Sequence, residues 1–503
     1  MTSISRHINL RGRRRIPIIR PSGSPSAAPS PPETGWTDQE SLPVATKIYV
    51  SSSTGSDANP GTEVSPIATL AEAYSRVTDG QPDWVLFRRG DTWDESWDEW
   101  KKSGTDSSNR IVIRAYGDVS TPRPILCAKD DDNWFAIGDG GNISVFDIDF
   151  YNRFRDPGHA DYDPAALGHD ALWFFAGTDN IRVEGCRFRY NRHGCSFQED
   201  AGRTPDNCVV YRCAFDYNYP DGAGLASGLF MTEGSGFTLE ECTFFHNGYL
   251  SGDPTNNRNH NLYLDNVDNL TFRGNFSIQS SNICAKMKGD WERSMVGGLY
   301  EKNVMGYSQI GLSFGGNAEN TDDFPPNGVI AFDNQVIQDN VFMHFGENVI
   351  PDQPQRRAIG IKVIEDSSFV RNYCILSENT VAPSPSHPIP DQAAQWLLDI
   401  PLGEQTNIVF TDNVIHRWRV GVQDPIRIDP ASGYTETGTI SGQADGYWVD
   451  YNRDLDAYAL EKGYGTTYVH LMNAACENRR GSWDTDLTAE AVYDWVVAGY
   501  TPA

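Results

Sequence analysis

The chain has 503 residues, of which 39% are hydrophobic, and its 68 acidic against 41 basic side chains give a formal net charge of −27. This charge excludes non-specific nucleic-acid binding through a basic surface. The composition excludes a collagen, a coiled coil and a wholly disordered chain, and no run of about 18 apolar residues predicts a transmembrane helix. At about 100–200 residues per domain, the length suits several domains or one elongated architecture.

The first 45 residues differ from the rest of the chain. Residues 1–32 contain no acidic side chain and six arginines, and their second half is rich in proline, serine and alanine. No apolar segment of about 7–15 residues follows the arginines, so the pattern does not match a secretory signal peptide. Two interpretations remain open: a disordered basic tail with its linker, or an arm that docks on another protein of a virus-like particle.

A short repeat runs through the body of the chain. Each copy has an apolar residue, a Cys or Asn three positions later, and another apolar residue two positions after that. The anchors lie roughly 30–40 residues apart. They are Ile148, Cys186, Cys213, Cys242, Asn275, Asn303, Asn340, Asn372 and Asn413. A repeat of this length predicts a solenoid in which each copy stacks on the next.

The repeat favours β-structure over the other repeat architectures. Its apolar residues alternate, and no long helical pattern lies between the copies, which argues against TIM-barrel and Rossmann folds. Stacking places Cys over Cys and Asn over Asn, with neighbouring coils about 4.8 Å apart. We therefore predict an all-β fold, a parallel β-helix of about nine coils over residues 140–420. The nine cysteines, an odd number without CxxC spacing, are expected to be interior residues.

The start of this region carries a family resemblance. Ile48–Val50, the turn-rich run Gly55–Thr62 and the segment Pro66–Ala73 resemble the opening of many members of the pectate-lyase-like superfamily. These right-handed parallel β-helix proteins include polysaccharide lyases, some glycosidases and phage tailspikes. The resemblance covers residues 46–450. It implies a first strand, a turn and a helix that caps the open end of the solenoid.

These patterns divide the chain into four parts. Residues 1–45 form the basic arm and linker, 46–139 the N-terminal cap and first coils, and 140–440 the parallel β-helix. Residues 441–503 form a small C-terminal cap. A cap is expected at each end because an open solenoid end exposes unpaired strand edges.

A second strand in each coil is expected to present an outward face. Alternation predicts two outward columns on neighbouring coils. One column is Phe175, Gln198, Thr232, Asp265, Lys286, Ser313 and Lys362, and the other is Trp173, Ser196, Phe230, Tyr263, Cys284, Gly311 and Gly360. His193 and His260 lie at the starts of these strands. Trp173, Phe230 and Tyr263 then form an aromatic platform suited to sugar rings, and His193 and Gln198 border it as binding residues.

Two reactions and a plain ion pair remain open on this face. Elimination from a uronate needs a base and a cation. Lys286 or Lys288 could be the base or the neutralising cation, Arg293 the neutralising cation, and His260 or Tyr263 the acid. Hydrolysis needs two carboxyls, for which Asp265 and its acidic neighbours qualify. In the third interpretation, Asp265 and Lys286 form an exposed ion pair without catalytic role.

No cofactor is expected, and no metal site is predicted. Asp130–Asp132 leave room for a calcium ion, although a solvated acidic loop is the favoured interpretation. The hypothesis that follows is a carbohydrate-binding spike or fibre of a phage-like particle that recognises cell-surface polysaccharide and could depolymerise it. The alternatives are a secreted or particle-bound polysaccharide lyase or glycoside hydrolase, and a purely structural solenoid.

The expected partners are polysaccharide and, through the arm, other proteins of the particle. No nucleic-acid partner and no membrane insertion are expected. Resemblance to tailspikes implies a homotrimer. The expected location is the surface of a virion or extracellular particle.

Overall fold

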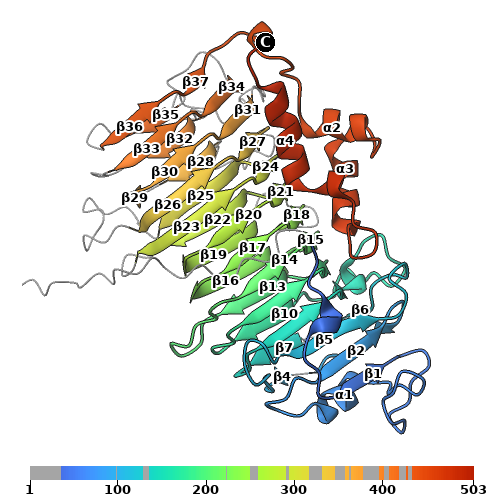
Figure 1. Cartoon of the computed structure of the whole chain (residues 1–503). Helices are drawn as coiled ribbons and strands as arrows, with labels where there is room; N and C mark the ends of the chain where they lie inside the picture. Colours follow the sequence, from blue (N-terminus) through green and yellow to red (C-terminus); the bar gives the residue numbers. More distant parts are fainter. Residues whose placement is uncertain are drawn as a thin grey trace, which may run out of the picture.

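The computed structural model describes residues 35–97, 99–127, 135–221, 224–249, 259–289, 294–316, 331–345, 357–361, 364–377, 396–400, 407–418, 426–428 and 433–503. Three parallel sheets run the length of the molecule, and the chain passes from sheet 1 to sheet 2 to sheet 3 in each complete coil. Figure 1 shows the coils stacked along one axis, with the colours following the chain from one end of the stack to the other. The fold is a right-handed parallel β-helix, as the repeat predicts.

Sheet 1 starts beside the N-terminal segment. Its strands are, in order, β1 (Lys47–Val50), β2 (Trp84–Arg88), β5 (Ile111–Tyr116), β8 (Ile143–Phe146), β11 (Ile181–Glu184), β14 (Val209–Tyr211), β17 (Thr238–Glu240), β20 (Thr271–Arg273), β23 (Met295–Glu301), β26 (Phe332–Gln338), β30 (Ser368–Val370), β33 (Ile408–Thr411) and β36 (Tyr434–Thr437). The short β29 (Ile364–Glu365) also pairs with β26.

Sheet 2 follows sheet 1 after a tight turn. Its strands are β3 (Thr92–Trp93), β6 (Ile125–Leu126), β9 (Asp149–Tyr151), β12 (Arg187–Arg189), β15 (Ala214–Asp216), β18 (Thr243–Phe245), β21 (Phe276–Ile278), β24 (Val304–Gly306), β27 (Val341–Met343), β31 (Tyr373–Ser377), β34 (Val414–Trp418) and β37 (Ile440–Ser441).

Sheet 3 carries the longest strands of the middle coils. Its strands are β4 (Glu99–Trp100), β7 (Phe135–Gly138), β10 (Asp170–Phe175), β13 (His193–Gln198), β16 (Ser227–Ser235), β19 (His260–Asp268), β22 (Ile283–Gly289), β25 (Ile310–Gly316), β28 (Arg357–Ile361), β32 (Trp396–Ile400) and β35 (Ile426–Ile428).

The interior consists of aligned columns of apolar side chains. In sheet 1, Val183 pairs in register with Val210, and the column continues through Leu239 and Phe272. In sheet 2, the rings of Phe188 and its neighbour on the next coil stack with centroids 4.9 Å apart. These columns are those of the sequence repeat, because inward residues of adjacent coils occupy equivalent positions.

The repeat anchors occupy the turn between sheets 1 and 2. Asn340 Oδ1 accepts hydrogen bonds from the main-chain nitrogen and the side-chain Nδ2 of Asn303, at 3.0 and 2.9 Å. The residue before the anchor is left-handed, as at Gly274 (φ 64°) and Asp339 (φ 55°). The buried amide therefore satisfies main-chain groups that a tight turn leaves without a strand partner. All nine cysteines are buried and free, as expected of interior residues.

The N-terminal helix packs into the same core. Helix α1 (Leu70–Arg76) buries Leu70 and Ala73, and Val77 beyond its end is also buried. Thr69 caps the helix by accepting a hydrogen bond from Glu72 N. Before β1, the short helix η1 (Gln39–Ser41) lies on the outer side of sheet 1.

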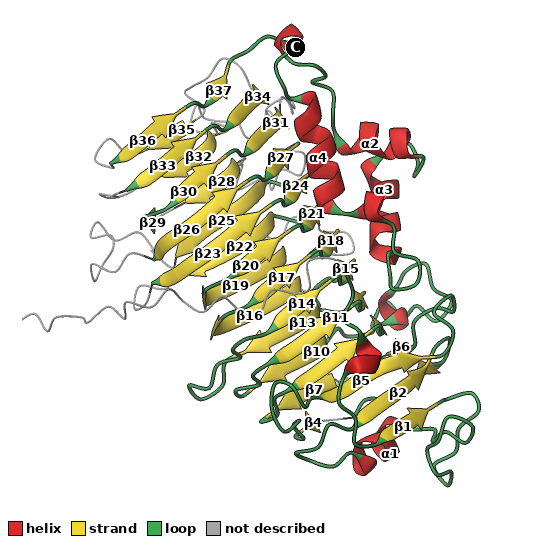
Figure 2. Cartoon of the chain, viewed as in Figure 1, coloured by secondary structure: helices red, strands yellow, loops and turns green. Residues whose placement is uncertain are grey.

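The C-terminal segment lies in a different place from the one we expected. It comprises η3 (Asp445–Tyr447), α2 (Leu455–Lys462), α3 (Tyr468–Glu477), η4 (Thr485–Leu487) and α4 (Ala489–Gly499). Helix α3 contacts β15 and β18, and α4 contacts β24, so the helices run along the outer side of sheet 2 (Figure 2). The reason is a strip of outward apolar side chains on sheet 2, which would otherwise face water.

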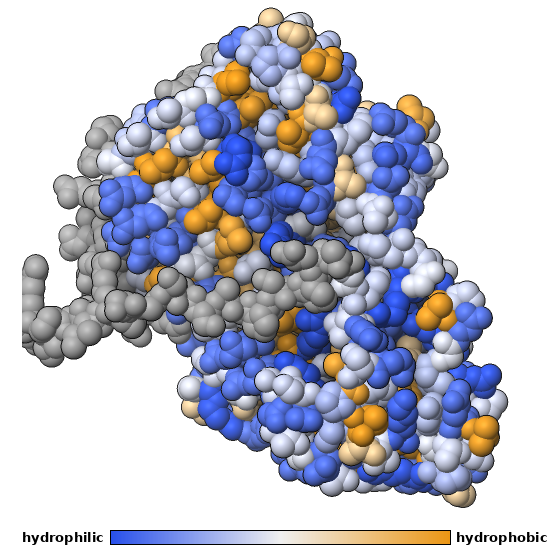
Figure 3. Space-filling model, in the orientation of Figure 1, coloured by the Kyte–Doolittle hydropathy of each residue, from blue (hydrophilic) through white to orange (hydrophobic). Residues whose placement is uncertain are grey.

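The solvent side of this C-terminal segment is mainly hydrophilic in the view of Figure 3, with isolated hydrophobic residues. Its apolar side chains, such as Leu471 and Val492, are instead buried against sheet 2. None of the described helices is long and apolar enough to cross a membrane. The segment thus acts as a lateral cover of the solenoid.

Candidate functional site: the outer face of sheet 3

Several strands of sheet 3 bend near their starts, β13 and β16 among them, and this bend decides which side chains face outward. Gly194 and Cys195 both point inward, since a Cβ on Gly194 would lie 2.8 Å from Phe188 Cβ and Cys195 is fully buried. His193 therefore lies on the outer side, although strict alternation would turn it inward together with Cys195, two positions later. The same bend recurs at Gly228, so the outer face gains an extra row at the strand starts.

Three outward rows follow from the strand register. The first row is Asp170, His193, Ser227 and His260; the second is Trp173, Ser196, Phe230, Tyr263, Lys286, Ser313 and Gly360; the third is Phe175, Gln198, Thr232, Asp265, Lys288 and Gly315. The expected columns hold as far as β19. At β22 and β25 they are wrong by two residues, because Lys286 stands beside Tyr263 and Lys288 beside Asp265, whereas Gly360 on β28 falls in the second row as expected.

Cys284 and Gly311 are also placed wrongly by the alternation rule. Both face the interior: Cys284 is fully buried, and a Cβ on Gly311 would lie 2.9 Å from the ring of Phe342. They occupy the bend of their coils, where two neighbouring residues turn inward. Lys362 and Arg293 lie outside the described residues, as do Asp130–Asp132.

Four half-buried aromatic residues form what we call the aromatic strip: Trp173, Phe175, Phe230 and Tyr263. Trp173 and Phe175 stack with ring centroids 4.4 Å apart, and Phe230 lies 5.6 Å from Tyr263 on the next coil. Trp173 and Phe230 are two coils apart, with the small buried Ser196 between them. The strip thus offers aromatic rings at steps of about 5–10 Å along the axis.

Asp170 is buried beside this strip, and three side chains donate hydrogen bonds to its carboxylate. Its carboxylate accepts hydrogen bonds from Ser196 Oγ at 2.7 Å and Arg192 Nη2 at 2.9 Å, and Gln198 Nε2 lies 3.4 Å away. Gln198, predicted as a binding residue, therefore has its amide positioned by a buried carboxylate. The sequence placed Asp170 only among the carboxylates that could serve hydrolysis, and it gave Phe175 no role beyond its place in an outward column.

The two histidines are buried and neutral. His193 Nδ1 lies 2.8 Å from Ser227 Oγ, and burial lowers the pKa of its imidazole. Burial, aided by the charge of Lys286, lowers the pKa of His260 to about 3. The ring of His260 lies nearly parallel to Tyr263, with centroids 5.7 Å apart. Both imidazoles therefore act as supports and hydrogen-bonding groups, because they carry no charge at neutral pH.

The charged groups of the third row form an ion pair. Lys288 Nζ lies 2.6 Å from Asp265 Oδ2, and both side chains are more than four-fifths buried. We expected Asp265 to face Lys286; the two-residue shift gives this partner to Lys288 instead. Burial, aided by the Asp265 charge, raises the pKa of the Tyr263 hydroxyl, which therefore stays protonated and can donate a hydrogen bond.

The predicted site residues that the structure describes thus gather on one face. Trp173, Phe230, Tyr263 and Gln198 line it, and the others surround the same coils. A cluster of three or more metal-ligating side chains is not found among the described residues. The chemistry at hand is aromatic stacking, a neutral hydroxyl donor and a lysine beside it.

No family model matches the chain, and neither does any curated protein. Among solved structures, a rhamnogalacturonan lyase has 16% identity and a TM-score of 0.45, covering 81% of this chain and 91% of that one. A pectate lyase has 11% identity and a TM-score of 0.42, covering 83% and 86%. The Dettilon tailspike protein has 9% identity and a TM-score of 0.44, covering 69% and 57%. These similarities concern the fold, which the parallel strands establish independently.

Proposed function

We propose that the outer face of sheet 3 binds a polysaccharide along the axis of the solenoid. The observation that carries this proposal is the aromatic strip, whose rings stay partly exposed on β10, β16 and β19, three of four successive coils. Aromatic rings combine a large apolar surface with edges and hydroxyls that reach water, which suits the faces of sugar rings. The parallel coils repeat this arrangement in one direction, as a chain of sugars does.

The charge of the protein favours a neutral or weakly anionic glycan. A net charge of −27 repels a polyanion at long range, while salt screens this repulsion beyond about 10 Å. Lys286 places a positive charge locally beside Tyr263, whereas the Lys288–Asp265 pair is neutral overall. The carboxylate of an acidic sugar in such a glycan would bind beside Lys286.

The test is binding to a panel of neutral and uronate-containing polysaccharides. Trp173→Ala and Tyr263→Ala are expected to weaken binding of the preferred glycan at least tenfold, which corresponds to about 1.4 kcal/mol or more. The matched control is Tyr434→Ala, which removes an aromatic side chain that is 49% exposed on β36 of sheet 1. Binding that survives both strip variants, or that falls equally in the control, would reject this face as the glycan site.

Cleavage of the bound glycan is the second candidate function. The supporting observation is the group of Tyr263, His260 and Lys286, in which a protonated hydroxyl and a lysine lie beside each other on adjacent coils. Elimination needs such a proton donor together with a base. Lys288 is less suited to act as the base, because its amine forms an ion pair with Asp265.

Product analysis separates binding from cleavage. Elimination creates an unsaturated sugar with ultraviolet absorbance, and hydrolysis creates reducing ends without it. Lys286→Met should abolish product formation while leaving binding within a few-fold of wild type. Binding by the wild-type protein without either product would leave a carbohydrate-binding protein and reject the depolymerase role.

The finer part of the proposal places this protein on a virion or extracellular particle, as a spike with residues 1–45 as its tether. Its support is the basic, acid-free composition of residues 1–32. The tether would leave from a fixed point, since Thr37 donates hydrogen bonds to the buried Glu184. Deleting residues 1–32 should prevent incorporation into particles without changing glycan binding, and unchanged incorporation would reject the arm. Light scattering tests the homotrimer.

A further inference from the structure

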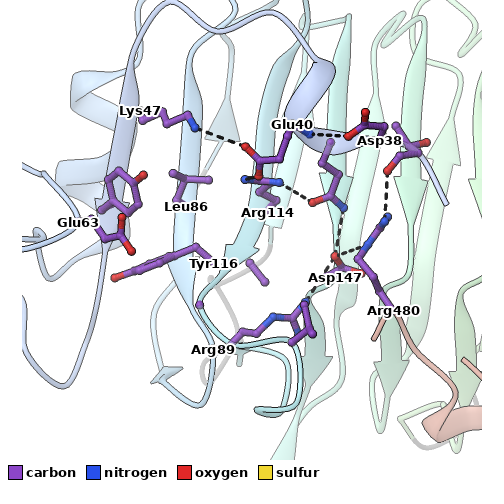
Figure 4. Close-up of a pocket in the computed structure, with 16 residues that line it drawn as sticks. Asp38, Glu40, Lys47, Glu63, Leu86, Arg89, Arg114, Tyr116, Asp147 and Arg480 are labelled. Atoms are coloured by element: carbon purple, nitrogen blue, oxygen red, sulfur yellow. Dashed lines mark hydrogen bonds and ion pairs between the residues drawn. The ribbon is translucent and has the colours of Figure 1, made fainter. Parts of the chain in front are cut away.

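A cavity lies on the outer face of sheet 1, whereas the aromatic strip lies on sheet 3. Its volume is about 430 Å³, within the range of small-molecule sites. Three parts of the chain line it: the N-terminal segment at 37–40, strands of the first coils, and Arg480 from the C-terminal segment. Figure 4 shows these side chains converging around Asp147.

Asp147 is the centre of a hydrogen-bonded cluster. Its Oδ2 accepts from Arg480 Nε at 3.0 Å and from Gln39 Nε2 at 3.1 Å, and Arg89 Nη2 lies 3.5 Å away. Gln39 in turn accepts from Arg114 Nη1 at 2.8 Å. The carboxylate is 2% exposed, and its Oδ2 is shared by the guanidinium groups of Arg480 and Arg89. Its Oδ1 makes no hydrogen bond within the described protein, and Arg480 also pairs with the buried Glu184 at 2.6 Å.

The other acidic residues of the cavity wall do not supply acceptors for Arg89. Glu40 pairs with Arg114 and lies 3.7 Å from Lys47, while Asp38 accepts from the Glu40 main chain. Glu63 is exposed at the opposite side. The charges on the wall are therefore balanced at its edges, whereas cations dominate around Arg89.

Arg89 is a buried cation with an unused donor. It is 7% exposed, and its Nη1 makes no hydrogen bond within the described protein. Arg123 and Arg479 lie near it, and each has a buried Nε in the same condition. Burial lowers the pKa of Arg89, and the charges of these arginines and Arg480 lower it further. Of Arg89, Arg123 and Arg479, only Arg89 lines the cavity, and its unused donor calls for an external acceptor there, because an unpaired buried donor costs free energy.

An aromatic wall stands beside these donors. The rings of Tyr49 and Tyr116 meet edge to face with centroids 5.0 Å apart, and Leu86 completes the apolar lining. Burial raises the pKa of Tyr116 to about 12, so its hydroxyl remains neutral. A ligand held here meets cationic donors on one side and apolar ring surface on the other.

The geometry points to a binding site for a small oxyanion of about monosaccharide size, with its carboxylate or phosphate group at Arg89 and its carbon skeleton against Tyr116. Arginine binds both groups through parallel N–H donors, so this chemistry is shared by sugar acids and by phosphate. The site is independent of the glycan face proposed above. Because its wall comes from both ends of the chain, an occupant would also hold the N-terminal and C-terminal segments on sheet 1.

Calorimetric titration of the full chain tests this site with D-glucuronate, inorganic phosphate and D-glucose at equal ionic strength. At least one anion should bind saturably, and glucose should not. Arg89→Gln should weaken that binding at least tenfold. The matched control is Arg88→Gln, which removes the same charge from the exposed neighbouring position and should change the affinity less than twofold. Trp173→Ala should also leave it unchanged.

The comparison of the two anions identifies the source of the ligand. Tighter binding of glucuronate, lost in Tyr116→Leu, indicates a sugar acid; tighter binding of phosphate indicates a phosphate group. Absence of saturable anion binding to the wild type, equal binding of glucose, or equal losses in the Arg88 and Arg89 variants would overturn the proposal.

A crystal soaked with arsenate covers the case in which Arg89→Gln fails to fold. Arsenate mimics phosphate, and its arsenic atom scatters X-rays anomalously. A peak beside Arg89 in the wild-type protein supports the site, and the absence of both this peak and saturable anion binding in the titration rejects it.

Discussion

The outer faces of sheets 2 and 3 share one coil geometry and differ in what lies on them. On sheet 2 the outward residues are apolar, such as Phe245, Ile278 and Val341, and the C-terminal helices bury them completely. On sheet 3 the aromatic strip stays half exposed and stands beside charged groups. Apolar surface that the protein needs for stability is covered by its own chain, whereas apolar surface left open suits a ligand.

The largest expected effect breaks the covered face. Phe245→Ala should lower the free energy of unfolding by about 3–5 kcal/mol, because it opens a cavity between sheet 2 and the helices. Phe230→Ala on the open face should cost less than half as much, since that ring is already partly in water. Urea denaturation of both variants measures the difference. Equal losses would contradict the contrast between the two faces.

Asn340 tests how much the buried turns between sheets 1 and 2 contribute to stability. Asn340→Leu should cost about 3 kcal/mol, because it strips hydrogen bonds from Asn303 and from the Tyr300 carbonyl in a buried turn. Asn473→Leu, on the exposed side of α3, is the control and should be within about 0.5 kcal/mol of wild type. A loss at Asn340 no larger than at Asn473 would show that the ladder does not stabilise the turns.

The open face should give the protein an acid-sensitive element at His260. The unfolded imidazole binds its proton near pH 6.5 and the folded one near pH 3, so stability falls as the pH drops below about 6.5. Between pH 7 and pH 5 this one group should cost about 2 kcal/mol. His260→Asn should remove that part of the pH dependence, whereas His470→Asn, at an exposed position of α3, should not. Parallel profiles of stability against pH for wild type and His260→Asn would refute the role of His260.

The smallest effect compares one ion pair from each face. Lys288→Met should cost about 1 kcal/mol, because the Lys288–Asp265 pair retains some contact with water. Arg187→Met should cost more, since Arg187 and Asp216 lie 2.8 Å apart under α3 and are almost fully buried. Double-mutant cycles measure both coupling energies. A larger coupling on sheet 3 would mean that its face is as well shielded as sheet 2.

Much of the fold could be predicted because the repeat carries it. Val183, Val210 and Leu239 are paired as their spacing predicts, since inward residues of stacked coils must share size and polarity. The position of the C-terminal segment could not be predicted in the same way. Its apolar residues predict a helix such as α4, but the surface that receives them consists of residues far away in the sequence.

The site was predictable as far as alternation holds. Trp173, Phe230 and Tyr263 fall in one outward row, as expected. The bend at the strand start breaks the alternation, because two neighbouring residues turn inward there. For this reason the rows predicted for Lys286 and Lys288 were wrong. The cavity around Arg89 gave no local pattern at all, since its wall joins residues from both ends of the chain.

The contacts of Arg480 with Asp147 and Glu184 fix the order in which the molecule can be completed during synthesis. The coils can stack as they leave the ribosome, whereas the helices that cover sheet 2 are made last. At about 5–20 residues per second, the apolar strip on the early coils waits for tens of seconds without its cover. A nascent chain of this protein therefore exposes this strip until the helices are made, and a chain that lacks its last 50 residues is expected to keep it exposed.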